Sequence, residues 1–367
     1  MVVYIHSSES AFTATGSFGL LPPRLGMLGL AGVDIFFVIS GVIIASTARG
    51  LTWREFVWRR FRRIMPMYWL TSILFLPIAS KFGYVFDWRG FIATCFLWPA
   101  TDKMSYPALE VAWTLCFEML FYIAATLVMV NIRLLIPLIG IFVLAVALRE
   151  HGPLFQFLGN PLIIEFFFGV ISAFIPRWRP AVWCLPIGVA GLVAVGLLGA
   201  AVPAGGIYAL IGDDNARRLL VYGVPSTFIV LGTMQFEARP SVWTVLGDAS
   251  YTLYLTHRLV ISFFFVLWSA YPIPSALIDV IGIGASVLFA WRVYVLFEVP
   301  LLNFFGRSMA NRHIEGAGYS RTGSSLWPVG WRDSRPRWPN ASDDGRPPTA
   351  SPTNLPVLIA SEEGSLD

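Results

Sequence analysis

Charged residues are scarce in this sequence. Asp, Glu, Lys and Arg make up 13% of its 367 residues, whereas 56% of the residues are hydrophobic. A soluble domain carries roughly 25% charged residues, because polar side chains must cover its surface. The composition therefore excludes a water-soluble globule and indicates an integral membrane protein. The net charge is +4, but the arginines lie in short clusters between apolar runs, so we expect no nucleic-acid partner.

Cysteine and histidine are also few. Each of the three cysteines, Cys95, Cys116 and Cys184, lies inside an apolar run, and none has CxxC spacing. Their odd number argues against a disulfide framework. The four histidines show no HxxxH or HExxH spacing, so we expect no metal site.

Apolar runs, in contrast, are abundant. A hydrocarbon core of about 30 Å requires about 20 apolar residues per helix. The apolar start, 1–5, is typical of the last turns of a further helix, and 91–99 is short enough to be re-entrant or interfacial. We therefore predict an all-α, polytopic transmembrane bundle of about ten spans, the first of them truncated. The nine complete runs are 32–47, 66–80, 109–130, 133–149, 161–175, 181–201, 218–236, 246–268 and 275–297.

The distribution of arginine predicts how the chain is oriented. Six arginines lie between the first two complete runs, and an excess of Lys and Arg marks the cytoplasmic side of a membrane. If 91–99 does not cross, alternation from this linker places Arg217 and Arg218 outside and the C-terminus in the cytoplasm. We expect the inner membrane of a bacterium.

The composition changes abruptly near the C-terminal end. From about residue 303 the chain is rich in Gly, Ser, Pro, Arg and Asp. Such a segment buries too little apolar surface to offset the entropy of ordering. We predict a transmembrane domain, 1–302, followed by a disordered cytoplasmic tail, 303–367.

Three basic residues are candidates for chemistry. Imidazole as a group titrates near neutral pH, so His6 could move a proton from a sugar hydroxyl to a leaving thiolate, or it could only mark a helix end. Arg60 and Arg63 share one face of a helix that we expect to be interrupted at Pro66. Paired guanidinium groups suit a pyrophosphate or a 3′-phosphate, but they could also anchor the chain at anionic lipid.

Acidic residues inside apolar runs are further candidates. Asp34, Glu118 and Glu165 lie in such runs, where a carboxyl group is costly and suggests a functional site. They could instead close hydrogen-bond networks between helices. We interpret His257 as a packing or helix-bridging residue and Glu298 as part of an interfacial salt bridge.

Taken together, six stretches resemble the membrane-bound acyltransferase family 3, particularly its polysaccharide O-acetyltransferase branch. They occur in the order found in that family and cover about 300 residues. The stretches are His6 after its apolar residues, GVDIFFVISGVII at 32–44, RRFRRIMPMYW at 59–69, WTLCFEMLFY at 113–122, LGDASYTLYLTH at 246–257 and FEVP at 297–300.

The resemblance implies transfer of an acetyl or other short acyl group from cytoplasmic acyl-coenzyme A to a hydroxyl of a glycan or glycolipid, with no permanently bound cofactor. It implies that His6 corresponds to the essential histidine of the first span. Arg60 and Arg63 correspond to the RxxR pair linked to coenzyme A binding. On this hypothesis His6 deprotonates the acceptor, or briefly carries the acyl group, and Asp34 or Glu118 orients its imidazole.

One departure from the family concerns the start of the chain. The first span of the family normally begins with an Arg-x-x-Ala pattern ten to fifteen residues before the histidine, whereas Met1 lies five residues before His6. We expect either a start codon assigned too late or the loss of half a span. Two other hypotheses therefore stay open, which are a glycan or lipid transporter without acyl-transfer chemistry and an inactive relative of the enzymes.

Overall fold

The computed structural model describes residues 1–200, 206–212, 214–237, 241–268 and 273–305. All of them belong to the first of two units into which the chain divides, Met1–Pro336 and Arg337–Asp367. The predicted tail, 303–367, lies outside the described residues apart from its first three positions, so its disorder stays a prediction.

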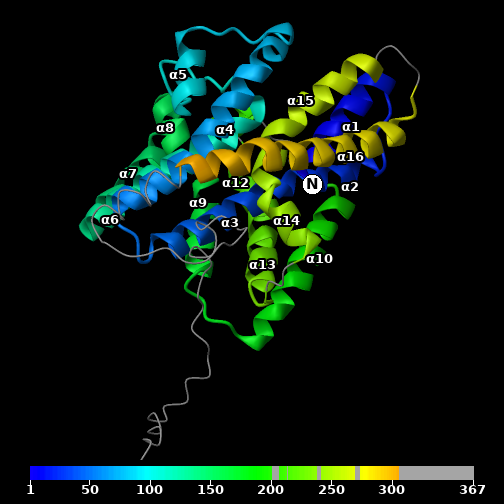
Figure 1. Cartoon of the computed structure of the whole chain (residues 1–367). Coiled ribbons are helices and arrows are strands. Elements are labelled where there is room, and N and C mark those ends of the chain that lie inside the picture. Colours follow the sequence, from blue (N-terminus) through cyan, green and yellow to red (C-terminus); the bar gives the residue numbers. More distant parts are fainter. Residues whose placement is uncertain (201–205, 213, 238–240, 269–272, 306–367) are drawn as a thin grey trace, which may run out of the picture. The chain divides into compact units, whose positions relative to one another are not determined.

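All regular secondary-structure elements of the described residues are helices, and no strand occurs among them (Figure 1). An isolated β-bridge joins Ala100 and Met104. The prediction of an all-α fold is therefore confirmed for this part of the chain. The helices are α1 (Val2–Thr15), α2 (Pro23–Gly26), η1 (Met27–Leu30), α3 (Ala31–Ala48), α4 (Trp53–Lys81), α5 (Trp88–Phe96), η2 (Glu110–Ala112), α6 (Trp113–Val130), η3 (Ile132–Leu134), α7 (Leu135–Ala147), η4 (Arg149–His151), α8 (Pro153–Leu158), α9 (Ile163–Ser172), η5 (Arg179–Trp183), α10 (Cys184–Leu197), α11 (Gly206–Ile211), α12 (Asn215–Arg218), η6 (Leu219–Gly223), α13 (Val224–Thr233), α14 (Val242–Asp248), α15 (Ser250–Trp268), α16 (Ser275–Val293) and η7 (Tyr294–Glu298).

Seven helical stretches of the described residues are long and apolar enough to cross a membrane. Each corresponds to one of the nine complete runs, whereas the full number of about ten spans is not confirmed. The run at 133–149 forms the shorter apolar helix Ile132–Ala147, and the run at 218–236 is not among the seven. The seven stretches are Pro23–Ala48, Trp53–Lys81, Glu110–Val130, Pro153–Ser172, Arg179–Leu197, Ser250–Trp268 and Ser275–Phe305.

Helix α4 differs from the sequence prediction, because Pro66 does not interrupt it. The helix has 29 residues and begins at a capping box in which Thr52 and Glu55 satisfy each other's main-chain N–H groups. At 1.5 Å per residue it is about 43 Å long. Neighbouring helices allow proline inside membrane helices. Five of the six arginines, all except Arg49, therefore lie in the first half of a helix that is long enough to span a membrane, and not in a separate linker.

Helix α5 is too short to cross, as the sequence predicted for this segment. Its nine residues span about 14 Å, and it starts at Asp87, whose carboxylate accepts a hydrogen bond from the N–H of Gly90 at 2.8 Å. Arg89 of this helix donates to Asp102 at 2.7 Å. That guanidinium holds the pKa of Asp102 at about 2. The pair that ties α5 to the following loop therefore stays charged at neutral pH.

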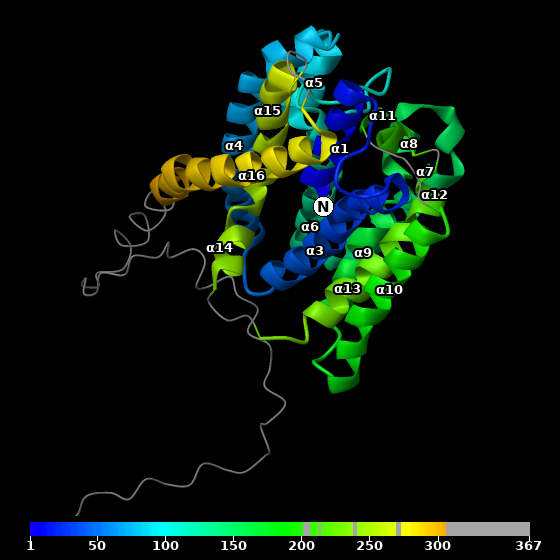
Figure 2. The same ribbon diagram turned by 90° about the vertical axis from the view of Figure 1, so that its right-hand side faces the viewer.

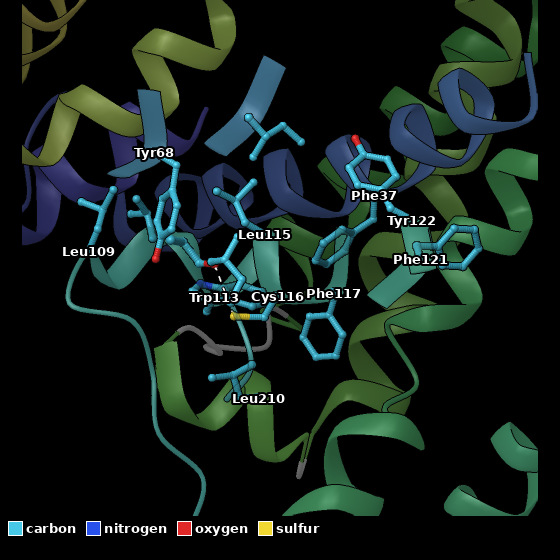
Figure 3. Packing of buried hydrophobic residues seen from close by; sticks show 14 of the residues in the cluster. Phe37, Tyr68, Leu109, Trp113, Leu115, Cys116, Phe117, Phe121, Tyr122 and Leu210 are labelled. Atoms are coloured by element: carbon cyan, nitrogen blue, oxygen red, sulfur yellow. Dashed lines mark hydrogen bonds between the residues drawn. The ribbon is translucent and has the colours of Figure 1, made fainter. Parts of the chain in front are cut away.

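The core is built from aromatic side chains on α3, α6 and α9. Figure 3 shows Phe37 close to Trp113 and Phe117, with ring centroids 6.0 and 6.1 Å apart. Glycines bring α3 against α9, because a Cβ on Gly41 would lie 2.2 Å from the main-chain oxygen of Phe166. Small residues at helix contacts are a common way to pack spans in lipid. This contact fixes the helix that carries Asp34.

Helices α1, α15 and α16 lie side by side, and α15 also packs against α4 (Figures 1 and 2). Helix α1 carries His6, α4 carries the arginine pair, and α15 lies against both. The packing therefore joins the two groups of predicted site residues through one helix.

Candidate active site

His6 lies on α1 with its side chain 19% exposed. Its Nδ1 is 3.0 Å from Oε2 of Glu9, three residues further along the same helix. An ionised carboxylate can only accept a hydrogen bond, so this contact places the imidazole proton on Nδ1. The Nε2 of His6 is then an unprotonated base. The sequence analysis did not single out Glu9, although its i, i+3 spacing from His6 could have indicated the pair.

His257 of α15 packs against this imidazole. The ring centroids of His6 and His257 are 5.4 Å apart, and the planes are inclined by 29°. His257 is fully buried, and its Nδ1 is 3.0 Å from the main-chain oxygen of Leu253. We had interpreted His257 as a packing or helix-bridging residue, and its stacking on His6 of another helix agrees with that interpretation. The same contact makes His257 a neighbour of the candidate base.

The two arginines of the RxxR pair have different surroundings. Arg63 forms a salt bridge with Glu298, whose carboxylate also accepts a hydrogen bond from Thr252. Arg60 donates to the hydroxyl of Thr47 at 2.5 Å and lies 5.5 Å from the ring of Tyr122. Arg63 is thus charge-compensated by a buried acid, whereas Arg60 contacts a hydroxyl group and aromatic rings.

Glu118 belongs to the arginine end of the site. It is buried on α6 and accepts a hydrogen bond from Tyr122, one turn further along the helix. Its carboxylate also interacts electrostatically with Arg60 and Arg63. Its hydrogen-bond partner is not His6. The predicted role of Glu118 in orienting the imidazole therefore has no support in the contacts.

Asp34 takes part in a different interaction. Its carboxylate accepts two hydrogen bonds from Arg218, at 3.0 and 2.7 Å, and both side chains are 0% exposed. Arg218 also donates to the main-chain oxygen of Leu30 at 3.2 Å. We had placed Arg218 in an outer loop on charge alternation, and that placement is wrong, because Arg218 is buried in α12. Glu165, also fully buried, lies beside this pair.

Side chains of α15 lie between Arg63 and the histidines. Tyr251 lies beside Arg63, with the guanidinium 5.6 Å from its ring. Tyr254 is within 2.6 Å of the Thr114 hydroxyl, and its ring centroid is 6.1 Å from that of His257. Tyr251 and His257 are six residues apart, which corresponds to about 9 Å along the helix. Among the described residues, no group of His, Cys, Asp and Glu is arranged to hold a metal ion.

The described residues contain seven candidate membrane spans, a histidine bound to a carboxylate and, elsewhere on the same bundle, a pair of arginines. These features are typical of a multi-pass membrane enzyme that uses a histidine as its base. Residues 1–295 match a family model described as an acyltransferase domain, so the chain belongs to acyltransferase family 3 and is a membrane O-acyltransferase. It is 33% identical over 297 residues, covering 75% of this chain and 90% of the relative, to the exopolysaccharide production protein ExoZ of Rhizobium meliloti (strain 1021). No solved structure matches the chain significantly.

Proposed function

We propose that this chain transfers an acyl group, in the simplest case acetyl, from cytoplasmic acyl-coenzyme A to a hydroxyl of a cell-surface or exported glycan. The observation that carries the proposal is the contact of His6 with Glu9, which leaves Nε2 of His6 as a free base. The printed name of ExoZ, which refers to exopolysaccharide production, supports a glycan as the acceptor.

Arg60 and Arg63 are proposed to bind the phosphates of the donor. Guanidinium groups bind phosphate oxygens through paired hydrogen bonds. Arg60 is the better placed of the two, because Arg63 is already paired with Glu298. The separation of about 9 Å along α15 between the levels of Tyr251 and His257 is short enough for an extended pantetheine arm to bring the thioester to His6.

The proposed reaction needs one base and one nucleophile. As the acceptor oxygen attacks the thioester carbonyl, its proton passes to Nε2 of His6, and the carbon–sulfur bond then breaks. The departing thiolate takes the proton from the imidazolium, which leaves an O-acyl glycan and free coenzyme A. In this scheme Glu9 takes the orienting role that we had expected of Asp34 or Glu118, because its carboxylate fixes the ring and stabilises the imidazolium.

A His6→Ala variant tests this proposal. We expect the O-acyl groups released by mild alkali from the surface polysaccharide of the producing strain to fall to the level of a strain lacking the gene. His151→Ala is the matched control, because His151 lies in η4 and is exposed. Normal O-acylation by a His6→Ala protein present at normal membrane levels would contradict the mechanism.

Transport without chemistry is the rival hypothesis, and it requires acidic side chains along a pathway. Asp34 is instead bound by Arg218 and Glu298 by Arg63. The transport hypothesis has no specific contact in its favour, whereas family membership favours acyl transfer.

A further inference from the structure

The Nε2 of His257 is a hydrogen-bond acceptor that has no partner among the described residues and no role in the proposed reaction. Its Nδ1 lies 3.0 Å from the main-chain oxygen of Leu253. Because a carbonyl oxygen can only accept, the proton is on Nδ1 and Nε2 keeps its lone pair. That Nε2 is buried and has no hydrogen-bond partner among the described residues. Buried polar atoms in proteins nearly always have a partner, so a donor from outside this set is expected.

The position of His257 indicates what that donor is. Its ring stacks on His6, with the centroids 5.4 Å apart. His6 also has its proton on Nδ1, towards Glu9. The two imidazoles therefore offer two unprotonated Nε2 acceptors on rings that stack on each other. Arg258, the next residue along α15, is already bound to Glu110 at 2.9 Å.

A ligand that suits two neighbouring acceptors carries two O–H donors. Hydroxyl groups on adjacent carbons of a sugar ring meet this requirement, whereas the thioester and the thiol ends of the donor do not supply two such groups. Water could satisfy His257 alone, but it would not explain why two imidazoles with unprotonated Nε2 atoms are stacked on each other.

We infer that His257 binds the acceptor, with its Nε2 accepting a hydrogen bond from a second hydroxyl beside the one that His6 deprotonates. The inference rests on the proposed function and names its acceptor as a diol. His257 takes no proton and forms no covalent bond in this role. Its hydrogen bond fixes which hydroxyl faces His6, so His257 determines acceptor affinity and the position of acylation.

Two substitutions distinguish the contribution of the acceptor nitrogen of His257 from that of its aromatic ring. His257→Phe keeps an aromatic ring against His6 and removes the acceptor, whereas His257→Gln removes the ring and keeps a carbonyl oxygen near the position of Nε2. Each is to be expressed as the full chain in the producing strain in place of the native gene. The measurement is the O-acyl content of the surface polysaccharide, divided by the amount of protein in the membrane.

We expect His257→Phe to lower O-acylation at least about tenfold and His257→Gln to stay within about threefold of the wild type. The affinity for coenzyme A, measured by calorimetry on the protein in nanodiscs, is expected to stay unchanged in both variants. Unchanged affinity also shows that each variant is folded.

Several results would overturn the inference. Full activity in His257→Phe with loss in His257→Gln would assign His257 to ring packing alone. Activity in both variants would mean that water satisfies Nε2, and loss in both would mean that an imidazole itself is required. A loss of coenzyme A affinity would place His257 on the donor. His6→Ala in the same strain separates the two ideas, since normal O-acylation there contradicts the proposed function regardless of His257.

Discussion

The contact between His6 and Glu9 leads to a prediction at the scale of single residues. A hydrogen bond to a charged group contributes about 1 kcal/mol more than one to a neutral group. We therefore expect Glu9→Gln to lower kcat about fivefold and to leave the KM for acyl-coenzyme A unchanged. Steady-state kinetics on the purified protein measures both parameters. Glu237→Gln is the control, because Glu237 is 80% exposed and lies 3.7 Å from its partner Arg177.

The unequal surroundings of Arg60 and Arg63 give a second residue-scale prediction. Arg60→Gln removes a phosphate-binding group without breaking an ion pair, so we expect a higher KM for acyl-coenzyme A and normal thermal stability. Arg63→Gln leaves the carboxylate of Glu298, 1% exposed, without its cation. We expect that variant to lose stability, by less than the ~3–5 kcal/mol of a fully buried pair. Equal stability in the two variants would argue against this division of roles.

Residue identity predicted the candidates better than it predicted their partners. His6, Arg60 and Arg63 were found from residue type, spacing and resemblance, and the structure places His6 and Arg63 against side chains of α15. The partners depend on which helix faces which, and that is decided by packing between segments distant in sequence. Arg218 illustrates the limit, because it looks like a loop residue until α12 brings it to Asp34. Glu9 is different, because it lies three residues from His6 on the same helix, and this spacing can be read from the sequence.

At the scale of helices, the buried pair of Asp34 and Arg218 holds α3 against α12. Removing one partner of a buried ion pair costs about 3–5 kcal/mol, whereas replacing both by apolar residues is often neutral. We therefore expect Arg218→Met to lower the melting temperature strongly and Asp34→Leu/Arg218→Met to recover most of it. Differential scanning fluorimetry in detergent measures both.

The double variant also tests whether Asp34 takes part in catalysis. With a structural role for the pair, the Asp34→Leu/Arg218→Met protein should keep O-acylation within about threefold of the wild type, as isolated changes away from reacting groups usually do. A double variant that is stable but inactive would indicate that Asp34 takes part in catalysis.

Helix boundaries were harder to predict than the existence of helices. Hydropathy identified the core of each of the seven spans, but it could not show that α4 starts thirteen positions before its apolar run. The capping box of Thr52 and Glu55 fixes that start, and it is a sequence signal that hydropathy does not read. Pro66 was misjudged for a related reason, because packing around α4 decides whether a proline interrupts the helix.

For the whole molecule, the apolar composition identifies an integral membrane protein, but it does not determine the number of spans. Burial in lipid requires apolar side chains, and their number can be read directly from the sequence. Whether a short run crosses depends on its neighbours, and Ile132–Ala147 is shorter than the seven candidates. The family match covers 1–295, which includes six of the seven candidate spans in full and most of the seventh.

The orientation of the whole molecule can be tested with two cysteine reporters, one at the start of α4 and one in the loop after α5. The arginine-rich start of α4 favours the cytoplasm, which places the loop after α5 outside. Arg54 and Lys103 are both exposed in these two regions. In a Cys95→Ser/Cys184→Ser background, which keeps only the buried Cys116, we expect a membrane-impermeant maleimide to label Lys103→Cys in intact spheroplasts. Arg54→Cys should react only after permeabilisation. Labelling of Arg54→Cys in intact spheroplasts would reverse the orientation and place the arginine pair on the side opposite to cytoplasmic acyl-coenzyme A.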